Sequence, residues 1–277
     1  MLAIDARESM RKIIRDAGLP HTDGELSDFK RLVAEQVGGE ASAVLCDLQY
    51  GERAIETLRR CYPGTGLVLA VDRYEEEFLG SLIESRFDEK AAERALSVEG
   101  VIALKLYVFW RRESREHFLE PATRRFIEHC RSSGVLSLVE GVITTDAASP
   151  NFDTDLVAAA ADFGRLQPDL YKTQLPSLGR QNSDEIERVA RELTDAVGVP
   201  WVVLSKGAKP HLFASSVEAV CRGGASGILA GRAIWSGALS EDDAEEELKT
   251  HGRGRLQDLG RIVDRWAHPW SARPPQK

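Results

Sequence analysis

The feature that most constrains the fold of this chain is a series of short apolar runs rich in Val, Ile and Leu, repeated along its length. Each run is followed by a charged segment of helical character, which is the pattern of parallel strands covered by crossover helices. The eight runs span 2–5, 43–47, 67–72, 101–108, 135–140, 169–174, 201–205 and 227–231. Eight such units predict an α/β fold, a single (β/α)8 TIM barrel; a doubly wound open sheet is the alternative.

The length of the chain, 277 residues, fits one large barrel domain spanning 1–277, in which the Pro-rich end 268–277 is expected to be a frayed tail. Two helices are predicted between the runs. One covers 183–198, where Asp184 and Glu187 have capping-box spacing and Gly198 ends the helix. The other covers 114–131, in which Pro121 marks either its true start or a kink.

The overall charge argues against several classes of partner. A formal net charge of -8 excludes a general nucleic-acid or anionic-membrane surface, although a local pocket for one small anion is compatible with it. The N-terminal stretch lacks the apolar core of a signal peptide, and no stretch reaches the roughly 18 apolar residues of a membrane span. Four cysteines without a CxxC pair fit reduced thiols, so we expect a cytoplasmic protein.

Polar residues stand where the runs end, and in a β/α barrel the reacting groups lie at the C-terminal ends of the strands. The polar residues at or near these ends are Asp5, Asp47, Asp72, Lys105, Glu140, Lys172, Ser205 and Arg232. Burying Lys105, Glu140 and Lys172 in apolar strands is costly unless they pair or perform chemistry. Asp72 is ambiguous, because the residues that follow it fit the start of a helix equally well.

These three residues suit imine chemistry on a carbonyl substrate. A lysine amine attacks a carbonyl only when deprotonated, and burial with a second cation nearby favours that form. We therefore predict Lys172 as the nucleophile, Lys105 as the neighbouring cation and Glu140 as the group that moves protons. The alternative is a buried ion-pair network that only stabilises the barrel.

A second group of residues predicts an anion site. The stretch 204–210 follows the seventh run and contains Ser205 and Gly207, and Gly231 and Arg232 follow the eighth. Backbone N–H groups, a helix N-terminus and a guanidinium at these positions would surround one phosphate. The six histidines are scattered without ligand spacing, so we expect neither a metal nor a cofactor.

Several long motifs in this chain resemble one known family. They are MLAIDARESM, LSDFK, ALKLYVFWR, ADFG, DLYKTQLP, PWVVLSKG, GASGILAGRAIW and LQDLGRIVD, and they are collinear over nearly the whole chain. The chain resembles the class I aldolases that cleave ketohexose 1-phosphates, which include tagatose 1,6-bisphosphate aldolase and, with the greatest similarity, sulfofructosephosphate aldolase.

The resemblance implies roles for individual residues. Lys172 would be the Schiff-base lysine, Lys105 the auxiliary lysine and Glu140 the acid/base group, with Asp5 as an active-site aspartate. The substrate and its phosphate would be held by Ser205, Gly207, Gly231, Arg232, Asp47 and Arg7. Arg7 and Arg73 are hypothetical contacts to a distal anion.

The resemblance also implies the reaction and leaves the substrate open. The enzyme would split 6-deoxy-6-sulfofructose 1-phosphate or tagatose 1,6-bisphosphate into dihydroxyacetone phosphate and a three-carbon aldehyde, as a homo-oligomer. The chain departs from the family at Ala6, where glutamine is usual, at Lys206 and at Gly141. Another imine reaction on a shorter sugar phosphate, or a non-catalytic regulator that binds sugar phosphates, remains an alternative.

Overall fold

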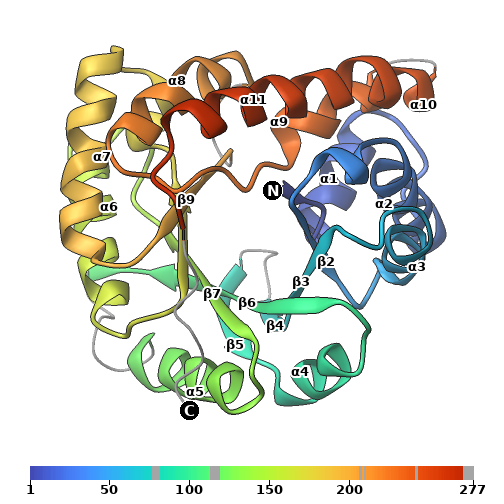
Figure 1. Cartoon of the computed structure of the whole chain (residues 1–277), viewed down its shortest axis with the longest axis horizontal. Coiled ribbons are helices and arrows are strands. Elements are labelled where there is room, and N and C mark those ends of the chain that lie inside the picture. Colours follow the sequence, from blue (N-terminus) through green and yellow to red (C-terminus); the bar gives the residue numbers. More distant parts are fainter. Residues whose placement is uncertain (77–81, 113–118, 206–207, 209, 241–242, 271–277) are drawn as a thin grey trace.

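The computed structural model describes residues 1–76, 82–112, 119–205, 208, 210–240 and 243–270. Seven parallel strands form one sheet in the order β1-β2-β3-β6-β7-β8-β9. Their bounds are Leu2–Ala3, Ala43–Asp47, Gly66–Ala70, Val101–Trp110, Leu136–Ile143, Leu170–Gln174 and Trp201–Leu204. In Figure 1 these strands curve around a centre, and the helices lie outside them.

The predicted eighth strand joins the two edges of this sheet. Ile228 bridges Val203 of β9, and Ala230 bridges Leu2 of β1, both in parallel. Backbone hydrogen bonds from Leu229 N to Val203 O (3.0 Å) and from Ala3 N to Ala230 O (2.8 Å) continue the ladder. The chain therefore forms the predicted (β/α)8 barrel, with the segment at 227–231 closing the ring by isolated bridges rather than as a regular strand.

The principal helices alternate with the strands. Their bounds are α1 Glu8–Asp16, α2 Asp23–Val37, α3 Glu52–Cys61, α4 Glu89–Leu96, α5 Leu119–Ser132, α6 Phe152–Gly164, α7 Ser183–Val197, α8 Pro210–Arg222, α9 Arg232–Trp235, α10 Ala244–Glu247 and α11 Arg253–Trp266. No helix in the part of the chain described here is long and apolar enough to cross a membrane.

The structure shows where the two predicted helices, α7 and α5, begin and end. Helix α7 is capped by Asn182, whose side chain accepts from Glu185 N (2.9 Å), so the predicted cap at Asp184 is wrong by two residues. Gly198 ends this helix with φ 61, as predicted, because glycine enters the left-handed region without steric cost. Pro121 lies in the first turn of α5 and marks the start of that helix rather than a kink.

The third run differs most from the prediction. Strand β3 ends at Ala70, and Asp72 begins an antiparallel hairpin of β4 (Asp72–Glu76) and β5 (Leu82–Phe87). The alternative that a helix starts after Asp72 is therefore wrong. Asp72 pairs with Phe87 of β5, and this pairing explains why the chain stays extended after Asp72.

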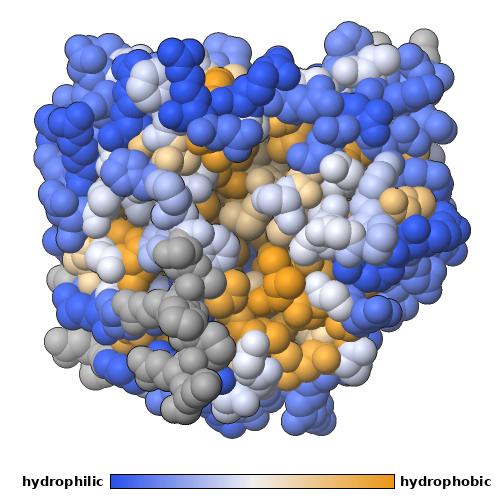
Figure 2. All heavy atoms as spheres, in the orientation of Figure 1, coloured by the Kyte–Doolittle hydropathy of each residue, from blue (hydrophilic) through white to orange (hydrophobic). Residues whose placement is uncertain are grey.

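Side chains of the barrel strands alternate between two apolar layers. Ala43, Leu45, Val68, Ala70, Ala103, Leu138, Leu170, Val202 and Leu229 form one buried cluster, and their sequence neighbours on each strand pack with the helices in a second. Because successive residues of a strand point to opposite faces, the first cluster fills the inside of the ring. Figure 2 shows a hollow on one face of the molecule in which apolar residues gather, ringed by hydrophilic ones.

The same alternation sets the direction of the predicted reactive groups. Lys105 lies two residues beyond Ala103, Glu140 two beyond Leu138 and Lys172 two beyond Leu170. All three side chains therefore point to the inside of the barrel, one layer above the apolar cluster. Strand β7 runs on to Ile143, so Glu140 lies within the strand and does not close it as predicted.

Candidate active site

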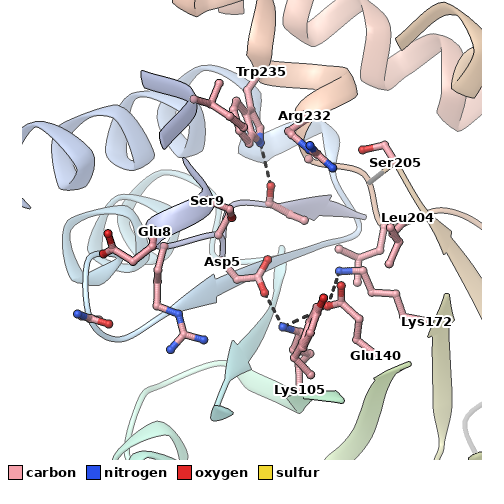
Figure 3. Close-up of a pocket in the computed structure, with 18 of the residues that line it drawn as sticks. Asp5, Glu8, Ser9, Lys105, Glu140, Lys172, Leu204, Ser205, Arg232 and Trp235 are labelled. Carbon is pink, nitrogen blue, oxygen red and sulfur yellow. Dashed lines mark hydrogen bonds and ion pairs between the residues drawn. The ribbon is translucent and has the colours of Figure 1, made fainter. Parts of the chain in front are cut away.

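A cavity of about 370 Å³ lies inside the barrel above the apolar layer. Its walls include Asp5, Lys105, Glu140 and Lys172 on one part and Ser205, Gly231 and Arg232 on another. The end of β1 and the start of α1 supply the stretch from Ala6 to Ser9, and Gln49 and Arg73 complete that side. Figure 3 shows Lys172, Glu140 and Lys105 close together, with Arg232 and Ser205 above them.

The two predicted lysines share one carboxylate. Glu140 Oε2 lies 2.9 Å from Lys172 Nζ and 3.1 Å from Lys105 Nζ. Strand register explains this closeness, because Glu140 is paired directly with Lys172 on the neighbouring strand, and Lys105 lies on the strand at the other side. Lys105 and Lys172 are 1% and 3% exposed, so their charges are screened little by solvent.

Lys105 is held by three carboxylates. Besides Glu140, its Nζ lies 2.8 Å from Asp5 Oδ2 and 3.2 Å from Asp72 Oδ1. Burial alone would raise the pKa of Asp5, but the ammonium groups of Lys105 and Lys172 outweigh it and hold that pKa well below its usual range.

Arg7 lines the cavity and is paired with the first residue of the hairpin. Its guanidinium donates to Asp72 O (2.8 Å) and also pairs with the Asp72 carboxylate. Asp72, which the sequence left ambiguous, is 3% exposed and joins Arg7 and Lys105 through its two carboxylate oxygens. Arg73 lines the cavity and is exposed.

The predicted anion residues come together at the other side of the cavity. Ser205 follows β9 directly, and Gly231 precedes α9, whose first residue is Arg232. No hydrogen bond or ion pair engages the Arg232 guanidinium among the described residues, and burial lowers its pKa. Gly207 lies outside the described residues, and α9 is only four residues long, so its dipole adds little.

Asp47 lies outside the cavity, contrary to its predicted contact with substrate. Its Oδ1 accepts from Gln49 N (2.9 Å) and Tyr50 N (2.8 Å), and its carboxylate pairs with Lys30 of α2. Lys30 and Asp47 are 0% and 1% exposed. Both carboxylate oxygens are engaged, so the residue fixes the loop after β2.

Three residues that the sequence did not single out matter to the site. In the sequence, Lys30 resembles any other charged residue of an amphipathic helix, and its neighbours do not indicate that it is buried. Gln49 lies two residues after Asp47, at the C-terminal end of a strand, and this position could have predicted that it lines the cavity. Trp235 donates from Nε1 to Ala3 O (3.0 Å) and ties α9 to β1.

Metal-binding and thiol groups do not contribute to this cavity. No cluster of three or more His, Cys, Asp or Glu suited to a metal occurs in the described ranges, which leave out 77–81, 113–118, 206–207, 209, 241–242 and 271–277. All four cysteines are free thiols, and burial raises the pKa of Cys221 to about 12. These observations leave the lysines and carboxylates as the reactive groups of the described cavity.

Known proteins with similar sequences and structures are aldolases. The family model for the DeoC/LacD family aldolases matches residues 1–237. Among solved structures, a fructose-bisphosphate aldolase from Slackia heliotrinireducens superposes with a TM-score of 0.61 at 18% identity, covering 86% of this chain and 75% of that one. An archaeal fructose-1,6-bisphosphate aldolase, with its catalytic lysine bound to a carbinolamine intermediate, gives 0.52 at 17% identity, covering 92% and 83%.

Curated relatives extend the comparison to sequence. Tagatose 1,6-diphosphate aldolase of Listeria monocytogenes is 27% identical, covering 97% of this chain and 88% of the relative. A second tagatose 1,6-diphosphate aldolase, from Enterococcus faecalis, is 23% identical over 98% and 91% of the two chains. The matched residues include every strand of the barrel and every described residue of the cavity wall. The chain therefore belongs to the DeoC/LacD family of aldolases, and aldolases are carbon–carbon lyases.

Proposed function

We propose that this enzyme reversibly cleaves a ketohexose 1-phosphate into dihydroxyacetone phosphate and a three-carbon aldehyde, through an imine on Lys172. The observation that carries the proposal is the contact of Lys172 Nζ with the Glu140 carboxylate (2.9 Å), inside a cavity that Arg232 also lines. A nucleophile, a proton carrier and a cation without a partner among the described residues line one cavity, and these are the groups this reaction needs.

Imine formation starts with a proton transfer. Lys172 gives one proton to Glu140, and its neutral amine adds to the C2 carbonyl of the ketose to give a carbinolamine. Glu140 then returns the proton to the departing hydroxyl, which leaves as water. The ammonium and the carbonyl have become an iminium ion and one water molecule.

Cleavage uses the same two groups. The Glu140 carboxylate removes the proton of the C4 hydroxyl, the C3–C4 bond breaks, and its electron pair flows into the iminium to give an enamine and the aldehyde. Glu140 then protonates C3 of the enamine, and water hydrolyses the resulting iminium to release dihydroxyacetone phosphate. Every proton taken up is returned within the cycle.

The role of Lys105 differs from simple repulsion of the Lys172 charge. Three carboxylates surround its ammonium at 2.8 to 3.2 Å, so most of its positive charge is compensated. Through the shared oxygen of Glu140, Lys105 also holds that carboxylate beside Lys172. Lys105 would thus keep Glu140 where it can exchange a proton with Lys172.

The phosphate of the substrate would lie against Ser205, Gly231 and Arg232. A half-buried guanidinium without a described partner favours an anion, and a phosphate offers it two oxygens at once. Bound there, the phosphate would leave C2 facing Lys172, since the two groups line the same cavity. The substrate is therefore a ketose phosphorylated next to its carbonyl carbon.

Two substrates fit the proposal. The motifs of the sequence favour 6-deoxy-6-sulfofructose 1-phosphate, which would give 3-sulfolactaldehyde, and the curated relatives favour tagatose 1,6-bisphosphate, which would give glyceraldehyde 3-phosphate. Both carry an anion at the distal end and differ in its chemistry. The single domain over 1–277, the homo-oligomer and the cytoplasmic location remain predictions.

The test is borohydride trapping with dihydroxyacetone phosphate in the presence of EDTA. We expect a stable adduct on Lys172 by intact mass and peptide mapping, none in Lys172→Met, and an undiminished adduct in Lys90→Met, a lysine on α4. An adduct on another lysine contradicts the proposed mechanism. No adduct at all favours a sugar-phosphate-binding regulator on the same barrel.

A further inference from the structure

We propose that Gln49 determines specificity for the aldehyde half of the substrate, by accepting a hydrogen bond from a hydroxyl group beyond the cleaved bond. The inference rests on the proposed function and adds a residue to it. Gln49 lines the cavity and belongs to neither the lysine–carboxylate cluster nor the phosphate side.

The order of strands places Gln49 opposite the nucleophile. Gln49 follows β2, which is second in the ring, and Lys172 lies on β8, which is sixth. The phosphate residues follow β9 and the segment 227–231, seventh and eighth in the ring. A ketose bound at C1 and C2 by those groups must extend its remaining carbons toward the side of the cavity that carries Gln49.

One hydrogen bond orients the side-chain amide of Gln49, which is an exposed residue at the cavity wall. Its backbone N–H donates to Asp47 Oδ1 (2.9 Å), and its Nε2 donates to Tyr50 Oη (2.8 Å). Asp47 is itself fixed by the buried ion pair with Lys30. Because Nε2 is engaged and Oε1 accepts no hydrogen bond from any described residue, the amide offers the cavity an acceptor.

The neighbours of Gln49 strengthen this preference for a hydroxyl. Glu8, at the start of α1, adds a carboxylate that accepts from Arg11 Nε (3.1 Å) and Tyr50 Oη (3.4 Å). Figure 3 shows Glu8 on the far side of Asp5 from Arg232. Gln49 Oε1 and the Glu8 carboxylate are acceptors for hydroxyl donors on a side that Arg7 and Arg73 also line, and the small Ala6 leaves room there for the sugar chain.

The experiment compares Gln49→Leu with the wild type and with Gln257→Leu, a matched change at an exposed glutamine of α11. Dihydroxyacetone phosphate is the donor. The acceptors are glyceraldehyde 3-phosphate, 3-sulfolactaldehyde and 3-oxopropyl phosphate, which lacks the hydroxyl next to the carbonyl. Borohydride trapping of dihydroxyacetone phosphate on each variant reports the half of the reaction that involves no aldehyde.

We expect Gln49→Leu to lower kcat/KM about tenfold for the hydroxylated aldehydes, mainly through KM, since one neutral hydrogen bond is lost. The change for 3-oxopropyl phosphate should be less than about twofold, and trapping should be unchanged. An equal loss for all acceptors, no loss for any, or no condensation by a wild type that still forms the adduct would overturn the inference. Absence of the adduct in the wild type would instead overturn the proposed function.

Discussion

At the scale of single residues, the site is a cluster of charges that stabilise one another inside the barrel. Lys105, Lys172, Asp5 and Glu140 are each at most 9% exposed, and their pairing offsets the cost of removing them from water. Asp72 adds a third carboxylate and links the cluster to Arg7. The two lysines of this cluster therefore favour the ionised form of Asp5.

Asp5 gives the clearest pH effect. Its pKa is held low mainly by Lys105 and Lys172 against the effect of burial, so the folded state binds fewer protons than the unfolded one. The stability this contributes is complete above the unfolded pKa, about 3.9, and is lost as pH falls below it, with a slope approaching about 1.4 kcal/mol per pH unit. Urea unfolding between pH 5 and 3 should show a shallower loss in Asp5→Asn than in the wild type. Equal slopes would contradict the assignment.

At the scale of elements, close packing decides which residues a strand can carry. Gly141 of β7 pairs across the sheet next to Glu140, and a Cβ there would lie 2.4 Å from Phe163 Cε2 and 2.8 Å from Tyr171 Cε2. Glycine at this position lets α6 approach the sheet closely. The packing of α6 thus helps to hold Glu140 in register.

Gly141→Ala should destabilise the protein by about 1–3 kcal/mol, because two aromatic rings must move. It should also slow imine formation with dihydroxyacetone phosphate, since a shift of β7 moves Glu140. Gly260→Ala in α11, where a Cβ meets nothing within 4 Å, is the control and should be stabilising by a few tenths to about 1 kcal/mol. Denaturant unfolding compares them, and equal effects at both positions would argue against the packing explanation.

Helix α2 and strand β2 are joined by the buried pair of Lys30 and Asp47. Lys30→Met leaves the Asp47 charge without its partner and should cost about 3–5 kcal/mol. The double variant Lys30→Met with Asp47→Asn removes both charges and should recover part of this loss. Thermal and urea unfolding of the three proteins form the test; additive losses would mean that the pair does not couple the two elements.

At the scale of the whole molecule, the barrel is closed by few contacts. The segment 227–231 bonds to β9 on one side and to β1 on the other, and Arg232 follows it directly. Arg255 of α11 donates from Nε to Ile234 O (3.1 Å) and steadies α9 from outside. The contacts that close the ring therefore also set the position of the Arg232 guanidinium.

Gly231→Ala tests that connection. Its Cβ would lie 2.7 Å from Ala3 O, across the closing seam, so β1 and α9 must separate slightly. We expect a loss of about 1–3 kcal/mol in stability and a higher KM for the phosphorylated substrate, with the adduct still formed on Lys172 at saturating dihydroxyacetone phosphate. Unfolding and steady-state kinetics measure both, and a change in stability without a change in KM would separate closure from phosphate binding.

The sequence by itself predicted the strand pattern and the positions of Lys105, Glu140 and Lys172 on it, because strand periodicity is local and leaves its mark in the order of residues. It left a doubly wound sheet as the alternative to the barrel. Tertiary structure decided the rest. Several contacts join residues that are distant in sequence. They are the ion pair of Lys30 with Asp47, the ion pair of Arg7 with Asp72, and the pairing of β4 with β5. No local pattern records such contacts, because their energies come from burial and register that exist only after the ring has closed.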